Sequence, residues 1–101
     1  MPVTHIVLCQ FAAATPEAEI RAIWADLAAL KDVVPGLIEA RFGSNISPEG
    51  LNRGIGHGFV ITFADASARD AYLAHPDHAA AGGRLVAACE GGIAGLTVLD
   101  I

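Results

Sequence analysis

The stretch that most constrains the fold is "VTHIVLCQF", residues 3–11, because it is apolar at odd and even positions alike. Successive side chains of a β-strand point to opposite faces of the sheet, so a strand with this pattern has both faces covered. The stretch "IGHGFVITF", residues 55–63, likewise carries no carboxylate, lysine or arginine on either face. The chain therefore needs a sheet in which these two strands are sheltered on both sides.

The first predicted helix lies in "TPEAEIRAIWADLAAL", residues 15–30. Thr15 is expected as the N-cap and Pro16 as the first helical residue, because a hydroxyl satisfies free amides there and proline has no amide to leave unpaired. Apolar residues recur three or four positions apart and form one stripe: Ile20, Ile23, Trp24, Leu27 and Leu30. The stripe predicts that this helix packs on one face of the sheet.

The second helical region is expected in separate pieces. "ASARDAYLAH", residues 66–75, is a predicted helix that Asp65 or Ser67 caps and that Pro76 interrupts. "PDHAAA" then forms a short turn, and "GGRLVAACEGG", residues 82–92, a short helix with its two glycine pairs as boundaries.

Two further strands complete the pattern. "LIEARFGSN", residues 37–45, alternates apolar with charged side chains, which predicts one wetter face; Ile38, Ala40 and Phe42 oppose Glu39 and Arg41. "GLTVLDI", residues 95–101, is the last strand. The order β, α, β, β, α, β predicts one α+β domain over residues 1–101 with a ferredoxin-like fold: a four-stranded antiparallel sheet with helices on one face.

This arrangement leaves one sheet face without helices, although the strands are apolar on both faces. The chain is 53% hydrophobic and only 17% charged, more apolar than a typical soluble domain. An uncovered apolar face marks an interaction surface, and the economical cover is a second copy stacked sheet on sheet. We therefore expect a homodimer.

Charge and length argue against two other classes of partner. The six basic residues are scattered through a chain of net charge −5, so we expect no nucleic-acid partner. No apolar run approaches the ~20 residues of a membrane span, and the N-terminus has no basic signal-peptide segment. We expect no membrane partner and a cytoplasmic location, with Cys9 and Cys89 as reduced packing residues.

The candidate chemistry lies in the histidines and the single tyrosine. Parity puts His5 and His57 on one face of the sheet if their strands are neighbours. Tyr72 and His75 lie on one side of the second helix, and His75 should end it because a proline follows. His78 would then fall in the first turn after the break, where the helix dipole favours a neutral imidazole and a general base becomes possible.

Each of these residues also has a purely structural interpretation. His5 and His57 could be packed core histidines, and Tyr72 a core aromatic with its hydroxyl at the rim. His75 could simply end the helix, and Asp77 would oppose the dipole at His78.

A metal site is the competing chemical interpretation, because four histidines could ligate zinc or iron. The proline within "HPDH" disrupts the helical spacing that paired ligands use, and no cysteine or glutamate completes a recognisable pattern. We expect no metal.

Four segments, in this order, resemble the stress-responsive dimeric α/β-barrel (Dabb) domain family: "HIVLCQF", "GSNISPEG", "GHGFVITF" and "AYLAHPDH". The resemblance covers essentially the whole chain. It implies a ferredoxin-like fold and a homodimer whose stacked sheets form a dimeric α+β barrel, in agreement with the two-sided strands.

The family includes olivetolic acid cyclase-like polyketide cyclases, which close a linear β-keto chain by intramolecular aldol condensation without a cofactor. By this resemblance His78 would be the general base and Tyr72 the hydrogen-bond donor to the oxyanion. His5 and His57, with Val7 and Phe59 beside them on their strands, would line the substrate pocket between sheet and helices.

Three functions follow as hypotheses. The first is a stress-responsive module whose homodimer binds a small apolar or β-keto ligand. The second is a cofactor-free lyase or cyclase, and the third is a monooxygenase of the dimeric α+β barrel class. Small residues around "RLVAACEGGIAG", residues 84–95, and Leu27 imply a pocket shaped differently from that of the cyclase.

Overall fold

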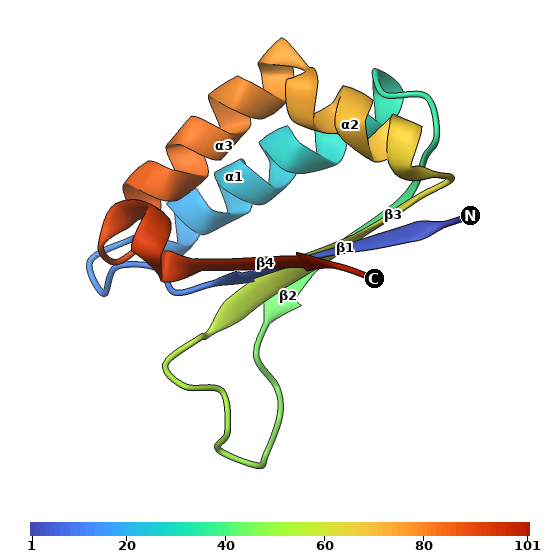
Figure 1. The fold of residues 1–101 in the computed structure, drawn as a ribbon. Coiled ribbons are helices and arrows are strands. Elements are labelled where there is room, and N and C mark those ends of the chain that lie inside the picture. The colour runs from blue at the N-terminus through green and yellow to red at the C-terminus, as the bar shows by residue number, and fades with distance from the viewer.

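The computed structural model describes all of residues 1–101 and confirms the predicted ferredoxin-like fold (Figure 1). The elements are β1 Val3–Cys9, α1 Glu17–Ala28, the 3₁₀ turn η1 Ala29–Asp32, β2 Leu37–Ser44, β3 His57–Phe63, α2 Ala66–Ala74, α3 Pro76–Ala88, the 3₁₀ turn η2 Gly92–Gly95 and β4 Leu96–Asp100. The sheet order is β2-β3-β1-β4, and all neighbours are antiparallel. The three α-helices lie on one face of the sheet.

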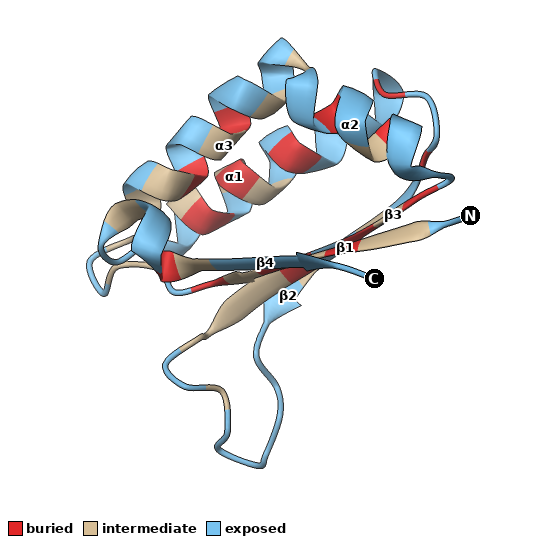
Figure 2. Cartoon of the chain, in the orientation of Figure 1, coloured by how far each residue is buried: buried red, intermediate tan, exposed pale blue.

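The core lies between this face and the helices, where Figure 2 shows the buried residues gathered. Val7 of β1 stands opposite Phe59 of β3 in register, and Ile61 lies two residues further along. Ile23 and Leu27 of α1 meet them from above and are almost fully buried. The two central strands thus supply one half of the core and the predicted stripe of α1 the other.

The start of α1 differs from the prediction. The helix begins at Glu17, and Pro16, in an extended conformation, is the N-cap without a side-chain hydrogen bond. The Thr15 hydroxyl instead donates to the carbonyl of Ala88 at 2.9 Å. Thr15 therefore ties the start of α1 to the end of α3, a partner 73 residues away that local capping rules do not reveal.

The inward face of β2 also differs from the prediction. Leu37 pairs with Phe63 and Glu39 with Thr62, so the register shifts at Ile38. A bulge of this kind turns one residue out of the alternation. Leu37 is consequently buried and Ile38 is 52% exposed, while Ala40 and Phe42 keep the inward face as expected.

The segment after Pro76 forms one helix where two short elements were predicted. The break itself is confirmed: His75 is extended, with φ −69° and ψ 135°, between α2 and α3. From Pro76, however, α3 continues through Gly82 and Gly83 to Ala88. Packing on α1 outweighs the low helix propensity of two glycines. Ala81 and Leu85 are buried there, and Arg84 pairs with Glu19 and Asp26 of α1.

The second face of the sheet carries no helix (Figure 1). Ile6 stands in register between Val60 of β3 and Leu99 of β4, so these three side chains form an apolar row across the sheet. Leu8 extends this row toward the loop 45–56, which projects on the same side. Ile46 and Leu51 in this loop are exposed.

Both cysteines are unpaired and buried. Burial, with the neighbouring Cys89 thiol, raises the pKa of Cys9 to about 12, so Cys9 stays a neutral packing thiol. Among the helices, none has the length and apolar character to cross a membrane.

Candidate functional site

Tyr72, the only tyrosine of the chain, lies at the centre of the candidate site. It is carried by α2, which Asp65 caps by accepting from the Ala68 amide at 2.8 Å. The tyrosine is fully buried, and its hydroxyl has no hydrogen-bond partner in the protein. Burial raises the pKa of Tyr72, so the phenol is protonated and available as a donor.

His78 faces Tyr72 from the first turn of α3, with 4.5 Å between the ring centroids. The turn is set by His75, whose Nδ1 accepts from the Asp77 amide at 3.1 Å at the helix start. Burial lowers the pKa of His78, the nearby His5 adds to this effect, and a contact with the Leu73 backbone opposes it. The imidazole of His78 is therefore neutral at neutral pH, as a general base must be.

His5 completes the cluster from β1. Its ring lies edge-on to Tyr72, at 5.9 Å between centroids, and is buried. His5 Nδ1 lies 2.6 Å from Oδ1 of Asp100 on β4, and Arg69 of α2 donates to Oδ2 at 3.0 Å. Burial alone would raise the pKa of Asp100, but the hydrogen bonds from His5 and Arg69 outweigh it and lower the pKa.

Asp100 and Arg69 are the polar members that sequence reasoning missed. Asp100 lies 95 residues from His5, and no local motif links the two. Strand pairing contained the one usable signal, because β1 and β4 are neighbours and Asp100 stands directly opposite His5.

His57 leaves the same sheet face as His5, as predicted, but the structure does not bring it into the cluster. His5 pairs with Ile61, whereas His57 pairs with Cys9 at the other end of the two strands. The His57 ring packs on Phe11 at 5.1 Å, and its Nε2 lies 3.9 Å from the exposed carboxylate of Glu17. A hollow of about 310 Å³ opens beside it.

An aromatic wall, composed of Phe11, Trp24, Phe42 and Phe59, extends from the His57 end to the middle of the sheet, where Phe59 lies between the two histidines in register. Trp24 is its centre, with ring centroids 5.3–5.6 Å from the other three. Phe59 and Val7, both predicted to line a pocket, are almost fully buried core residues. In this structure Val7 and Phe59 pack within the core between the two histidine ends.

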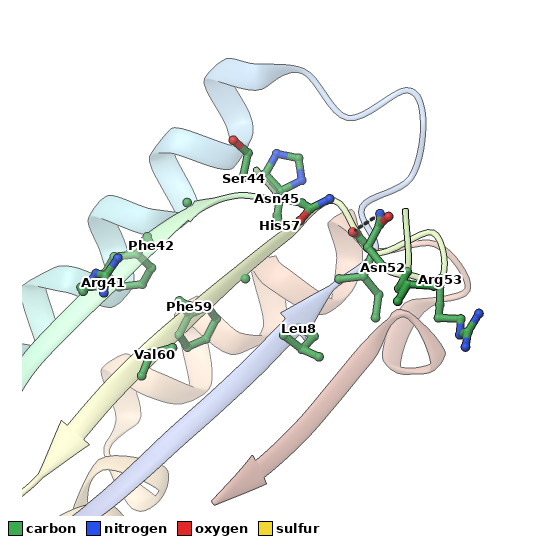
Figure 3. A pocket seen from close by; sticks show the side chains of 14 residues that line it. Leu8, Arg41, Phe42, Ser44, Asn45, Asn52, Arg53, His57, Phe59 and Val60 are labelled. Atoms are coloured by element: carbon green, nitrogen blue, oxygen red, sulfur yellow. Dashed lines mark hydrogen bonds between the residues drawn. The ribbon is translucent and has the colours of Figure 1, made fainter. Parts of the chain in front are cut away.

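A larger surface hollow, about 530 Å³, includes His57 and Phe59 among its lining residues (Figure 3). It is formed by the loop 45–56 and the adjoining parts of β2 and β3, and it includes Leu8 and Val60 of the open face. Arg41 and Arg53 lie at opposite ends of this hollow and do not converge on one point. Tyr72, His78 and His5 do not line it, so size alone does not mark the reactive groups.

The cluster combines a buried hydroxyl donor, a neutral imidazole and a histidine held by a carboxylate. This set can hydrogen-bond a carbonyl oxygen and take a proton from an adjacent carbon. Nowhere in the chain do three or more histidine, cysteine or carboxylate side chains gather in a way that could hold a metal ion.

Comparison with known proteins agrees with this fold. The family model of the stress-responsive A/B barrel domain matches residues 3–101. The stress-response A/B barrel domain-containing protein HS1 of Arabidopsis thaliana is 30% identical over 77 residues, which are 76% of this chain and 71% of that protein.

Two solved structures are informative about shape. A dimeric ferredoxin-like protein of unknown function from Jannaschia sp. CCS1 superposes with a TM-score of 0.93 at 37% identity, over 100% of this chain and 98% of that chain. A hydroxynitrile lyase from Passiflora edulis superposes with a TM-score of 0.83 at 24% identity, over 99% of this chain and 91% of that chain. At this identity the second match shows a shared fold only.

Proposed function

Because the chain belongs to the stress-responsive A/B barrel (Dabb) domain family, we propose that it works as a homodimer that binds a small apolar or β-keto molecule between sheet and helices. The observation that carries this proposal is the Tyr72 hydroxyl, which is fully buried without a protein partner. An unpaired buried hydroxyl costs about 1–3 kcal/mol. A ligand carbonyl oxygen would accept its hydrogen bond and recover that cost.

The surroundings of Tyr72 define the chemical class of ligand. Phe63 and His5 pack against its ring at 5.1 and 5.9 Å, so the walls are aromatic. His78 is half-buried, so the cluster reaches the surface there as well as at the partly exposed Asp100. Gly82, one turn later, leaves space beside this imidazole, since a Cβ there would stop 3.8 Å from Cε1. An apolar molecule with one or two carbonyls suits this environment.

The sole tyrosine allows a direct binding test. Protein labelled with ¹³C at the phenol carbon of tyrosine gives one NMR signal, which is titrated with β-keto N-acetylcysteamine thioesters. We expect a saturable shift of this signal. Tyr72→Phe has no tyrosine signal, so isothermal titration calorimetry compares it with the wild type, and we expect about fivefold weaker binding, the loss of roughly one hydrogen bond. His57→Ala, at the other end of the sheet, is the control and should bind as the wild type does. A signal that no thioester moves would refute the proposed binding.

The homodimer rests on the open face of the sheet. The apolar row of Ile6, Val60 and Leu99 has no cover within one chain, and the Jannaschia protein of the same fold is dimeric. Stacking two such faces buries the row. In light scattering at low micromolar concentration we expect a dimer for the wild type and a monomer for Val60→Glu. Ile93→Glu, an exposed apolar site on the helix side, should stay dimeric.

A second candidate function is a cofactor-free lyase or cyclase, favoured by the neutral His78 imidazole that packs against Tyr72 with its ring tilted by 54°. His78 would take a proton from the methylene between two carbonyls, and the electron pair would move onto the carbonyl oxygen. Tyr72 would donate a hydrogen bond to this enolate oxygen. In a cyclase, the enolate carbon would attack a second carbonyl of the same molecule, and His78 would return the proton to the new alkoxide.

Proton exchange separates this candidate from simple binding. In D₂O, an active chain would replace the acidic α-protons of a β-keto thioester faster than buffer does, as ¹H NMR would follow. His78→Ala should lower the protein-dependent rate by about a hundredfold or more, the usual contribution of a general base. His57→Ala should retain that rate. Binding without accelerated exchange would leave the chain a binding module.

A further inference from the structure

We propose that Arg69 is a positioning residue of this site: through Asp100 it holds His5 with the proton on Nδ1, so that Nε2 is a hydrogen-bond acceptor within the cluster. The role in binding rests on the proposed function, whereas the protonation pattern of His5 does not. The proposal joins side chains from α2, β4 and β1 into one line of contacts.

The guanidinium of Arg69 is fixed from two sides. Its Nε and one terminal nitrogen donate to Oδ1 of Asp70 at 3.1 and 3.0 Å. Its other terminal nitrogen donates to Oδ2 of Asp100 at 3.0 Å. A planar guanidinium with both edges engaged has little freedom to rotate, so Arg69 fixes the orientation of the Asp100 carboxylate.

The two oxygens of Asp100 have separate partners. Oδ2 accepts from Arg69, and Oδ1 faces His5 Nδ1 at 2.6 Å, a short distance typical of a charge-assisted hydrogen bond. The pKa of Asp100 is lowered, so the carboxylate is ionised and can only accept. The proton between the two groups therefore belongs to His5 Nδ1. In a neutral imidazole the second nitrogen, Nε2, then carries the lone pair.

This protonation pattern complements the rest of the cluster. Tyr72 supplies a donor, and His5 packs edge-on to it. An acceptor on His5 allows the site to bind both groups of the enol form of a β-keto compound: the carbonyl oxygen by Tyr72 and the enol hydroxyl by His5. With the proton on Nε2 instead, the site would offer two donors, and the proton of the enol hydroxyl would have no acceptor there.

The chain contains a matched control in Arg84. This residue also makes a forked ion pair, donating twice to Glu19 at 2.8 Å and once to Asp26 at 3.0 Å. It links α3 to α1, as Arg69 links α2 to β4, but neither carboxylate contacts a histidine. Arg84→Gln therefore removes a comparable surface ion pair without touching the proposed line of contacts.

The experiment reads His5 directly, without ligand. Long-range ¹H–¹⁵N NMR at mildly alkaline pH identifies which ring nitrogen carries the proton, and His5→Gln assigns the signals. In the wild type we expect the resonance of the proton on His5 Nδ1 to be shifted strongly downfield. Asp100→Asn should lower the Nδ1-protonated form to about half, because an amide can accept or donate. Arg69→Gln should speed exchange of this proton with water about tenfold, and Arg69→Lys should restore most of the protection.

The outcomes separate this proposal from the proposed function. A wild-type His5 protonated on Nε2 overturns it, and so does an Arg84→Gln variant that changes the His5 proton as much as Arg69→Gln does. A wild-type chain that binds no β-keto thioester refutes the proposed function, while the His5 signals still decide the role of Arg69. Where the thioester binds, Arg69→Gln should weaken its binding about threefold and Arg84→Gln should not.

Discussion

His5 and His57 start from equivalent positions and reach different environments. Both project from the helix-covered face of the sheet, on neighbouring strands. His5 is buried beside Tyr72, an ionised carboxylate and a second imidazole. His57 is partly exposed beside Phe11 and the solvated carboxylate of Glu17. The aromatic wall separates the two ends.

Both residues are histidines on the same sheet face, so the groups that contact each imidazole decide which histidine belongs to the site. At the His5 end, low exposure strengthens each polar contact and makes the unpaired Tyr72 hydroxyl costly. At the His57 end, the Glu17 contact is 3.9 Å long and Glu17 is largely exposed, so the pair contributes little. A ligand that needs directed hydrogen bonds finds them at one end only.

The largest expected effect comes from breaking the wall that separates the two ends. Trp24→Ala removes the ring at its centre, and we expect the free energy of unfolding to fall by about 3 kcal/mol, as for other large-to-small aromatic changes. Urea denaturation followed by circular dichroism measures this loss. Trp24→Phe keeps a ring in the wall and should lose less than half as much. Equal losses for the two variants would show that the indole does not carry the packing.

A smaller effect is expected at the Tyr72 hydroxyl, and it has the opposite sign. Tyr72→Phe removes an unpaired buried hydroxyl while the ring stays packed, so the free energy of unfolding should rise by about 1 kcal/mol. The same urea denaturation measures it. The variant would then be more stable and yet bind β-keto thioesters less well. A clear loss of stability would mean that the hydroxyl has a partner in solution.

Two neighbouring glycines of α3 sharpen the comparison further. Gly82→Ala and Gly83→Ala should each stabilise the helix by about 0.5–1 kcal/mol, because both lie in its interior. Only Gly82 adjoins His78, whereas nothing lies within 4 Å of a Cβ at Gly83. Thermal unfolding should therefore give similar gains, while thioester binding falls for Gly82→Ala alone. Equal binding by both variants would place the ligand away from this side of His78.

The smallest effect is a pH dependence of the free energy of unfolding, which we expect from His78. Burial keeps the pKa of His78 below its ordinary value of 6.5 in the folded chain. As pH falls below that value, the unfolded chain takes up this proton before the folded one, so the free energy of unfolding decreases. Urea denaturation at neutral and mildly acidic pH should show that His78→Gln loses less stability than the wild type. Identical losses would contradict a lowered pKa.

Local sequence rules predicted those parts of the fold that depend on local geometry. Pro76 forced His75 out of helical geometry, and Asp65 capped α2 through its own side chain. Strand alternation correctly put His5 and His57 on one face. Alternation failed at Ile38, because a bulge depends on the partner strand, and glycine propensity failed at Gly82, because packing on α1 decides that helix.

Three members of the candidate site, Tyr72, His78 and His5, were predictable from the sequence, but their arrangement was not. Tyr72 and His78 flank the break in the helical region, and their closeness follows from that break. The distance from His5 to His57 depends on register, and four residues of strand are enough to separate them. Asp100 and Arg69 enter the site only through tertiary contacts. Asp100 is 95 residues from His5 and 31 residues from Arg69 in sequence, and no spacing rule links residues so far apart.

Because Asp100 lies on β4, the contact between Asp100 and His5 lasts only as long as this strand stays paired. β4 lies at the edge of the sheet and makes its strand pairing with β1 alone; beyond it, two backbone hydrogen bonds between Thr4 and Ile101 close the end. Edge segments open locally at a lower free energy than the whole chain unfolds. Each opening of this end carries Asp100 away from His5 and frees the imidazole to exchange its proton. The lifetime of the ordered site is then set by how often the last strand frays.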